Sequence, residues 1–178
     1  DGFAQTLWQR RAELCTALLP QVTTAHARLS EGAESVRIEH ASTQHMGSLH
    51  EALLTMREEE SRSRSTAFGP HRDDITMLLN DLDATTFASE GQQRSFALSM
   101  KLAQAHVLEK ARGEAPLMLI DDVFGELDAH RRRALLACLP PGTQKIITTT
   151  HLDWAQADHI SGLVHRVEQG RLVSGQNP

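Results

Sequence analysis

The sequence predicts an α/β protein with a parallel sheet within residues 68–178, preceded by a mainly helical lobe over residues 1–67. Two apolar segments, residues 117–120 and 145–150, have the length and composition of fully buried parallel strands. A helical segment over residues 128–139 lies between them and is long enough for one crossover connection. The 178 residues, 40% hydrophobic and 23% charged, are enough to form a compact core.

The first lobe is predicted to combine helices with one short strand. Leucines at helical spacing indicate a helix that Pro20 ends, followed by a second helix as far as Leu29. Alternating valine and isoleucine predict a strand over residues 35–40. Residues 47–64 are again helical in pattern and end in a polar run of glutamate, serine and arginine.

The pattern then changes to strands and one long helix. Residues 74–79 and 85–87 are predicted as strands on either side of a turn at Asn80 and Asp81. Residues 92–112 carry apolar side chains on two helical faces, which predicts a largely buried helix.

Local signals mark the helix starts and the final hairpin. Ser89 and Asp128 are good N-caps for the two helices of this region. Residues 163–168 and 171–173 are predicted to form a hairpin about Gly170, and we expect this hairpin to close the sheet.

Polar residues follow the two apolar strands at the edge where open α/β sheets bind ligands. Asp121 and Asp122 follow the first strand, and His151 follows the second. Asp121 can hold a magnesium ion while Asp122 faces a water that attacks a phosphate. The alternative is a solvated loop start for the aspartates and an ordinary surface position for His151. The neighbouring motifs favour the site.

The start of the long helix is a candidate anion site. A helix capped by Ser89, with the small residue Gly91 nearby, presents free backbone N–H groups and a positive dipole end. The alternative is an ordinary capped helix.

Four motifs, taken in this order, resemble the C-terminal half of the RecF family, ABC-type ATPases related to SMC and Rad50 proteins. They are GPHRDD at 69–74, ASEGQQR at 88–94, LIDDV at 119–123 and GELD at 125–128. The resemblance implies an incomplete ABC-ATPase-like P-loop fold. Residues 1–67 would form a helical arm lobe, and residues 68–178 the C-terminal half of the ATPase head.

The resemblance implies roles for the residues at the strand ends. Asp121 matches the Walker B carboxylate that holds Mg²⁺. Asp122 stands where such ATPases usually have a glutamate that orients the hydrolytic water, and its shorter side chain implies slow turnover. His151 matches a histidine that senses the γ-phosphate.

The resemblance also implies contacts across a dimer. Ser89, Gly91 and Gln92 fall in the signature motif, which contacts ATP held by the opposite subunit, although Glu90 replaces a glycine there. Asp128 ends the D-loop, which crosses the dimer interface.

The role of the GPHRDD motif has two readings. Gly69 and Pro70 specify a turn, and Arg72 is placed to reach a phosphate or an interface carboxylate. The alternative is a structural turn with an internal ion pair.

The sequence contains no Gly-x-x-x-x-Gly-Lys-Ser/Thr phosphate loop. The resemblance places that loop near the N-terminus of the complete protein, and this chain begins with Asp1. We therefore expect a C-terminal fragment that by itself neither binds ATP tightly nor hydrolyses it.

Charge and composition argue against several classes of function and location. The net charge of −5 argues against DNA binding driven by overall charge. No apolar run suits a membrane span, and we expect no membrane association, a cytoplasmic, nucleoid-associated location and no zinc site. The two cysteines are expected to be reduced.

The resemblance implies that the complete protein is a recombination mediator with weak DNA-dependent ATPase activity. It would bind ATP and Mg²⁺, form an ATP-dependent homodimer on DNA at gaps, junctions or stalled forks, and help to load a recombinase together with a RecR-type protein. Two alternatives stay open: a DNA-tethering ATPase head of the SMC or Rad50 type, and a non-catalytic dimerisation module with the ATPase fold.

Overall fold

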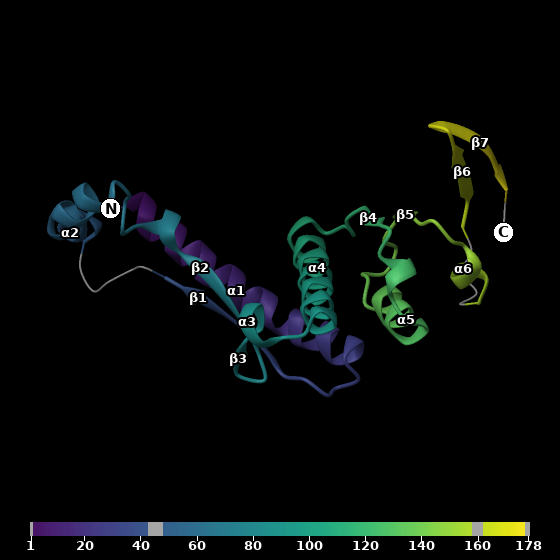
Figure 1. Cartoon of the computed structure of the whole chain (residues 1–178), viewed down its shortest axis with the longest axis horizontal. Helices are drawn as coiled ribbons and strands as arrows, with labels where there is room; N and C mark the ends of the chain where they lie inside the picture. The colour runs from purple at the N-terminus through teal and green to yellow at the C-terminus, as the bar shows by residue number, and fades with distance from the viewer. Residues whose placement is uncertain (1, 43–47, 158–161, 177–178) are drawn as a thin grey trace.

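The computed structural model describes residues 2–42, 48–157 and 162–176. The molecule is elongated, with the N-terminal helix and α2 at one end and the C-terminal hairpin at the other (Figure 1). No helix in these ranges is both long and apolar enough to cross a membrane.

Helix α1 (Gly2–Leu29) is continuous through Pro20, so the predicted break at Pro20 is wrong. Proline cannot donate a backbone hydrogen bond to the preceding turn, which normally weakens a helix interior. Here α1 buries Leu18 before Pro20 and Val22 and Ala25 after it. Packing on both sides of the proline therefore holds the helix together.

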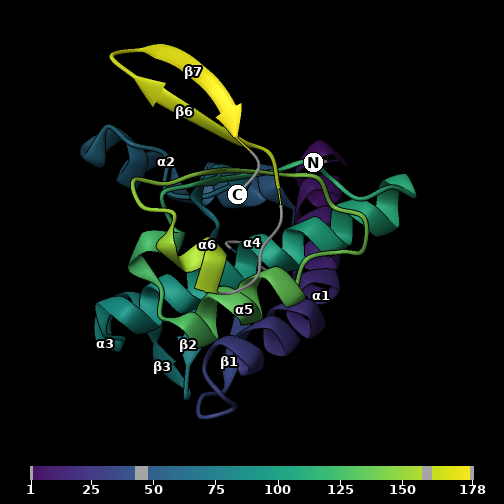
Figure 2. The same cartoon turned by 90° about the vertical axis from the view of Figure 1, so that its right-hand side faces the viewer.

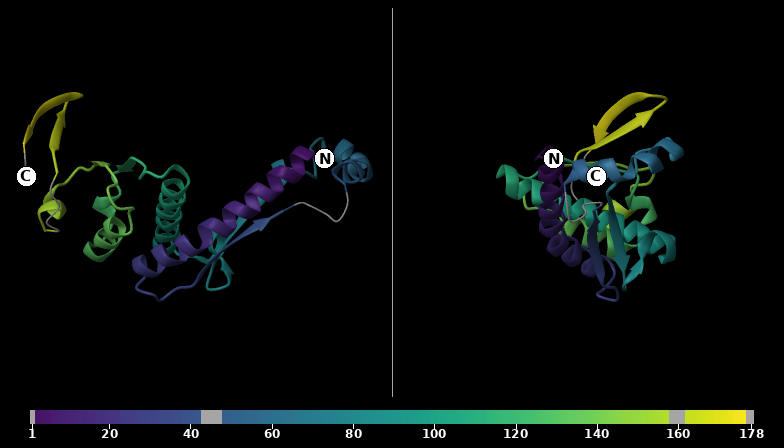
Figure 3. Two further views of the ribbon diagram at one scale, coloured as in Figure 1. Left: turned by 180° about the vertical axis from the view of Figure 1, so that it is seen from behind. Right: turned by 90° about the vertical axis from the view of Figure 1, so that its left-hand side faces the viewer.

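An antiparallel sheet lies along α1 (Figure 3). It consists of β1 (Val36–Ala41), β2 (Asp74–Leu79) and β3 (Leu82–Asp83) in that order. These bounds confirm the predicted strands at 35–40 and 74–79. Asn80 and Asp81, with φ of 50° and 65°, form the turn between β2 and β3.

The predicted strand at 85–87 is wrong, because these residues belong to a short helix, α3 (Ala84–Phe87). The Asp83 carboxylate accepts hydrogen bonds from the backbone N–H groups of Thr85 and Thr86. This cap favours a helical turn over the strand that the β-branched threonines suggest.

Helix α2 (Leu49–Ser63) confirms the helical prediction for this segment, and Ser48 and Glu51 form a capping box at its start. Its inner side packs on the beginning of α1, where Trp8 and Phe68 meet edge to face with ring centroids 6.1 Å apart. A short 3-10 helix, η1 (Pro70–Arg72), follows Gly69, the first residue of the GPHRDD motif.

Helix α4 (Glu90–Arg112) confirms the predicted long helix, with Ser89 as N-cap and Gly113 as a left-handed C-cap. It leads into a parallel pair of strands, β4 (Met118–Asp121) and β5 (Lys145–Thr148).

The crossover between β4 and β5 contains η2 (Phe124–Glu126) and α5 (Ala129–Ala137). Helix α6 (Asp153–Ala157) follows β5, and Trp154 stacks on Phe124 with 4.6 Å between ring centroids. Ala25 and Leu29 of α1 belong to the same core as these elements.

The prediction that both strands are fully buried is wrong for this chain. Leu119 and Ile146 are direct partners in the β4–β5 register, and they are 71% and 51% exposed. Ile120 faces the other way and is buried in the core. Elements of this structure therefore cover one face of the strand pair and leave the other apolar face open.

The C-terminal hairpin consists of β6 (Val164–Glu168) and β7 (Arg171–Gln176). Within the described ranges, it forms a separate two-stranded sheet and stands away from the rest of the molecule (Figure 2). The predicted hairpin is confirmed, but the prediction that it closes the sheet is wrong. Its positive-φ turn at Gln169 and Gly170 pairs β6 and β7 with each other rather than with β4 or β5.

Candidate functional site

The ends of β4 and β5 bring the two aspartates and Thr148 together. The parallel register places Thr148 opposite Asp121, and the Thr148 hydroxyl donates a hydrogen bond to the Asp121 carboxylate. The Asp122 N–H lies 3.1 Å from the carbonyl oxygen and 3.1 Å from the hydroxyl oxygen of Thr148. Thr148 therefore fixes both aspartates at the carboxyl edge of the strand pair.

Asp122 has left-handed backbone geometry, with φ of 51°. This conformation is uncommon for a residue with a side chain, although aspartate adopts it more readily than most. It ends β4 abruptly and leaves the side chains of both Asp121 and Asp122 exposed.

The chemistry of this edge fits a magnesium ion held together with a phosphate. Mg²⁺ is typically bound through one or two carboxylates and keeps several waters and phosphate oxygens as further ligands. Asp121 and Asp122 supply two such carboxylates. In the described part of the chain, no three His, Cys, Asp or Glu side chains cluster as a complete protein-only metal site.

His151 follows β5 in a loop that Thr149 organises. The Thr149 hydroxyl donates to the His151 carbonyl oxygen at 2.9 Å, and the Trp154 indole N–H donates to the same hydroxyl at 3.3 Å. The His151 side chain is exposed. The structure thus places it just beyond the strand that carries Thr148, at the edge predicted from the sequence.

The start of α4 forms a second group of candidate residues. Ser89 Oγ accepts from the Gln92 N–H at 3.3 Å, and Gln92 Oε1 accepts from the Ser89 N–H at 2.8 Å. This reciprocal capping box fixes the first helical turn. Ser89 and Gly91 are exposed.

Gly91 has no structural requirement that explains a glycine. It lies in the first turn of α4, and a Cβ atom added to it would meet nothing within 4 Å. Glycine in a helix interior is about 1 kcal/mol less favourable than alanine. The open space in front of Gly91 is what a close external partner requires.

Asp128 forms a third group at the start of α5. Its carboxylate accepts from the Arg131 N–H at 2.8 Å. The pKa of Asp128 is lowered, chiefly by this hydrogen bond and also by the charges of Arg131 and His130. The predicted N-cap is therefore confirmed, and the carboxylate favours its ionised form.

An ion pair connects the second and third groups. Arg94 of α4 contacts Glu126 at 2.9 Å and Glu90 at 3.1 Å. This ion pair brings the start of α4 into contact with the segment that precedes α5. The sequence does not predict this pair, because Arg94 and Glu126 belong to separate motifs and neither motif shows that their side chains meet.

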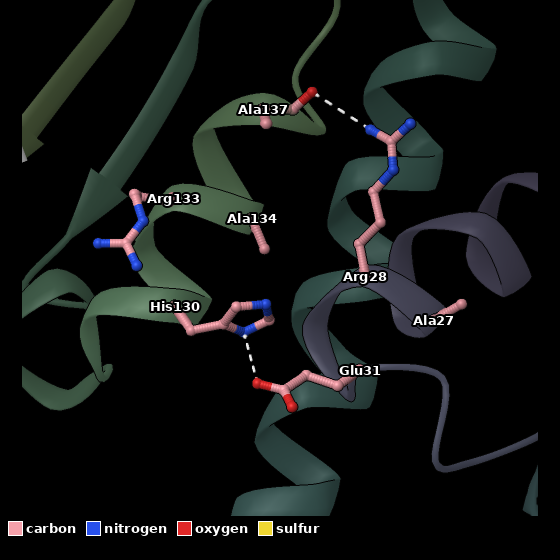
Figure 4. Close-up of a pocket in the computed structure, with 7 residues that line it drawn as sticks. All are labelled: Ala27, Arg28, Glu31, His130, Arg133, Ala134 and Ala137. Atoms are coloured by element: carbon pink, nitrogen blue, oxygen red, sulfur yellow. Dashed lines mark hydrogen bonds and ion pairs between the residues drawn. The ribbon is translucent and has the colours of Figure 1, made fainter.

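Helix α5 also packs beside the end of α1 (Figure 4). His130 lies 3.5 Å from Glu31, and Arg28 donates to the Ala137 carbonyl oxygen at 3.5 Å. Between them lies an open groove of about 480 Å³, lined mainly by these residues and the alanines of both helices. None of the predicted site residues lines this groove.

The GPHRDD motif builds a turn whose Asp73 pairs with residues outside the motif rather than with His71 or Arg72. The Asp73 side chain is 1% exposed and lies 2.9 Å from Arg11 and 3.1 Å from His40. Arg72 donates to the Thr66 carbonyl oxygen and to the Ser65 hydroxyl within its own loop. These contacts account for the motif structurally, and a phosphate contact by Arg72 stays a prediction.

Comparison with known proteins gives a consistent result. No protein-family model matches the chain. A DNA replication and repair protein RecF from Gloeobacter violaceus is 35% identical over 98% of this chain and 49% of its own length. RecF from Symbiobacterium thermophilum is 37% identical over 92% of this chain and 47% of its own length. The chain spans about half the length of the curated relatives that it matches.

Solved structures agree with the sequence relatives. The recombination mediator protein RecF-ATPrS in the RecFOR pathway superposes with a TM-score of 0.76 and 25% identity, over 96% of this chain and 47% of that chain. RecF-ATP in the same pathway gives a TM-score of 0.77 at 24% identity, over 97% of this chain and 47% of that chain. This likeness confirms the predicted ABC-ATPase-like fold class.

Proposed function

Because the chain belongs to the RecF family, we propose that it supplies the Walker B, signature and D-loop parts of a DNA-repair ATPase. In this proposal residues 1–67 are the arm lobe, and residues 68–178 are the C-terminal half of the head. The second half of α1 shares its cores with α4 and α5, and β1 pairs with β2, so the two parts are in direct contact.

The full-length protein would act in DNA repair and recombination as a mediator. It would bind ATP and Mg²⁺, dimerise on DNA at gaps, junctions or stalled forks, and help to load a recombinase with a RecR-type partner. The names of the relatives and of the solved RecF-ATP structures support this role. Slow ATP hydrolysis would then release the dimer.

The main support for the proposal is the open space in front of Gly91 at the start of α4. A helix start with an exposed cap, a free N-terminal dipole and a glycine with open space before it suits a phosphate brought by another molecule. Ser89, Gly91 and Gln92 would meet the ATP that is held by the opposite subunit. Asp128 would lie beside the same interface, since Arg94 ties its segment to the signature.

The strand-end residues would act on the nucleotide held by their own subunit. Asp121 would bind Mg²⁺, which withdraws charge from the phosphates when it is bound. Asp122 would orient the attacking water, and His151 would contact the γ-phosphate. The chain lacks the phosphate-loop motif, so these residues alone would neither bind ATP tightly nor hydrolyse it.

The test is ATP-driven dimerisation of the full-length protein carrying Gly91→Ala. We expect the variant to stay folded and to gain about 0.5–1 kcal/mol of stability, because alanine favours the helix. We also expect ATP-dependent dimerisation, measured by sedimentation, to weaken at least about tenfold, because a methyl group clashes with the approaching phosphate.

Gly2→Ala is the matched control. Gly2 is also a helical glycine with nothing within 4 Å of an added Cβ, and it lies at the far end of α1. It should leave ATP-dependent dimerisation unchanged. Equal dimerisation of Gly91→Ala and the wild type would favour the non-catalytic module instead.

A further inference from the structure

A chain of hydrogen bonds connects the signature segment to the interior of α1. Gln92, whose side-chain oxygen closes the Ser89 cap, donates from its amide nitrogen to one oxygen of Glu34 at 2.8 Å. The other Glu34 carboxylate oxygen lies 2.8 Å from Nε2 of His26. Nδ1 of His26 lies 3.2 Å from the Ser99 hydroxyl, which donates to the Ser95 carbonyl oxygen at 2.7 Å.

The network is buried at its centre. The His26 side chain is 0% exposed, and that of Glu34 is 16% exposed. Withdrawing a carboxylate and an imidazole from water has a large desolvation cost, and such pairs are often no more stabilising than apolar residues of similar volume. Fold stability alone therefore gives a weak reason for this arrangement.

The backbone around Glu34 is fixed on both sides. After α1 ends, Glu31 and Gly32 adopt left-handed φ values of 56° and 74°, and the Gly32 N–H donates to the Ala27 carbonyl oxygen at 2.8 Å. Ser35 exchanges hydrogen bonds with Asn80 in the β2–β3 turn, at 2.9 Å in each direction. Glu34 thus approaches Gln92 from a rigid corner between α1 and the antiparallel sheet.

Glu34 decides which way the Gln92 amide points. A carboxylate can only accept hydrogen bonds, so it selects the NH₂ end of the amide. The oxygen end is then left to face the Ser89 N–H, as the capping box requires. Without this selection the amide can flip, and the Ser89 N–H then faces a donor.

We infer that Glu34 and His26 are positioning residues that couple the arm helix α1 to the nucleotide-facing signature segment. The expected effect on ATP-dependent dimerisation rests on the proposed function. The coupling itself is a property of one subunit. A displacement of α1 would reach Ser89 through His26, Glu34 and Gln92.

The experiment uses Glu34→Gln in the full-length protein. Because the Glu34 carboxylate can only accept, Nε2 of His26 is the donor of this pair. With Nε2 still protonated, the new amide keeps its oxygen on His26 and turns its NH₂ group toward Gln92. Gln92 must then flip to accept from it, and the hydrogen bond from the Ser89 N–H to the Gln92 side chain is lost. We expect hydrogen exchange in segment 88–92, measured by mass spectrometry, to quicken about tenfold, as for the loss of one hydrogen bond. ATP-dependent dimerisation should weaken by a similar factor.

Two further variants make the result specific. Glu34→Gln combined with Gln92→Glu swaps the partners and restores each hydrogen bond, so it should recover slow exchange and stronger dimerisation. Glu31→Gln is the matched control, since Glu31 is on the same turn, is 72% exposed and pairs with His130. It should behave as the wild type.

The remaining outcomes overturn either the inference or the proposed function. Unchanged exchange in Glu34→Gln, or faster exchange with wild-type dimerisation, overturns the inference. An unfolded Glu34→Gln protein that the partner swap does not rescue also overturns it, because the network is then purely structural. If the wild type does not dimerise with ATP, the proposed function fails, and the exchange result alone decides the positioning role.

Discussion

Asp122 combines an exposed carboxylate with a left-handed backbone at the end of β4. Asn tolerates this conformation as well as Asp does, so Asp122→Asn should preserve the local fold while removing the negative charge. In the full-length protein we expect ATP hydrolysis to fall at least about a hundredfold, the usual scale for losing a general base. ATP-dependent dimers should form and persist longer. Single-turnover hydrolysis and dimer lifetime measure both effects, and a wild-type hydrolysis rate would remove Asp122 from catalysis.

Asp73 is the most deeply buried carboxylate of the GPHRDD turn, where it pairs with Arg11 and His40. Removing one member of a buried ion pair leaves an uncompensated charge, so Asp73→Ala should destabilise the fold by about 3 kcal/mol. Urea unfolding measures this change. Asp74→Ala, at the exposed neighbouring position, is the control and should change stability by less than about 0.5 kcal/mol. Equal effects would show that the ion pair contributes nothing.

Asp128 gives a prediction for pH, because its pKa is lowered in the folded state by the Arg131 N–H. Asp128→Ala should cost about 1 kcal/mol at neutral pH through loss of the cap. The part of this effect due to ionisation is fully present above the ordinary pKa of about 3.9 and is lost as the pH falls through the lower folded pKa. Asp128→Asn keeps an N-cap side chain but removes the charge, so this variant measures the contribution of the ionised carboxylate alone. Unfolding curves at neutral and at acid pH measure the loss of stability in each variant. A loss that is the same at both pH values would contradict this prediction.

Helix α1 is continuous despite Pro20. Because Pro20 is exposed and interrupts only the backbone ladder, Pro20→Ala should stabilise the fold by up to about 3 kcal/mol. Thermal unfolding measures the change. Ala17→Gly, at another exposed position of α1, should shift stability in the opposite direction by about 1 kcal/mol. A destabilised Pro20→Ala protein would indicate that the proline ring itself is packed.

Elements with local signals were predictable from the sequence. The starts of α4 and α5 follow from Ser89 and Asp128, because an N-cap acts within one helical turn. The strand expected at 85–87 is a helix instead, because the Asp83 cap also acts within one turn and favours α3. The continuity of α1 and the contact between Glu34 and Gln92 depend on tertiary packing, which leaves no periodic signal in the sequence.

The burial of the strands could not be predicted from the sequence, because it depends on which other parts of the molecule cover each face. Leu119 and Ile146 on the strand pair, and Val167 and Leu172 on the hairpin, are all more than half exposed. Large exposed apolar patches mark contact surfaces or aggregation sites. We expect the isolated 178-residue chain to bind a hydrophobic dye and to self-associate. Leu119→Lys combined with Ile146→Lys should reduce both, and an unchanged dye signal would contradict this account.

In the proposed mechanism, the signature of one subunit completes the ATP site of the other. The most direct measurement mixes two inactive full-length variants, Ser89→Arg and Asp121→Asn, and follows ATP hydrolysis. If the sites are shared across the dimer, a mixed dimer contains one intact site, formed by Asp121 of the first variant and Ser89 of the second. We therefore expect the mixture to regain hydrolysis that neither variant has alone. If the mixture stays inactive, although each variant still forms mixed dimers with the wild type, the composite site is contradicted.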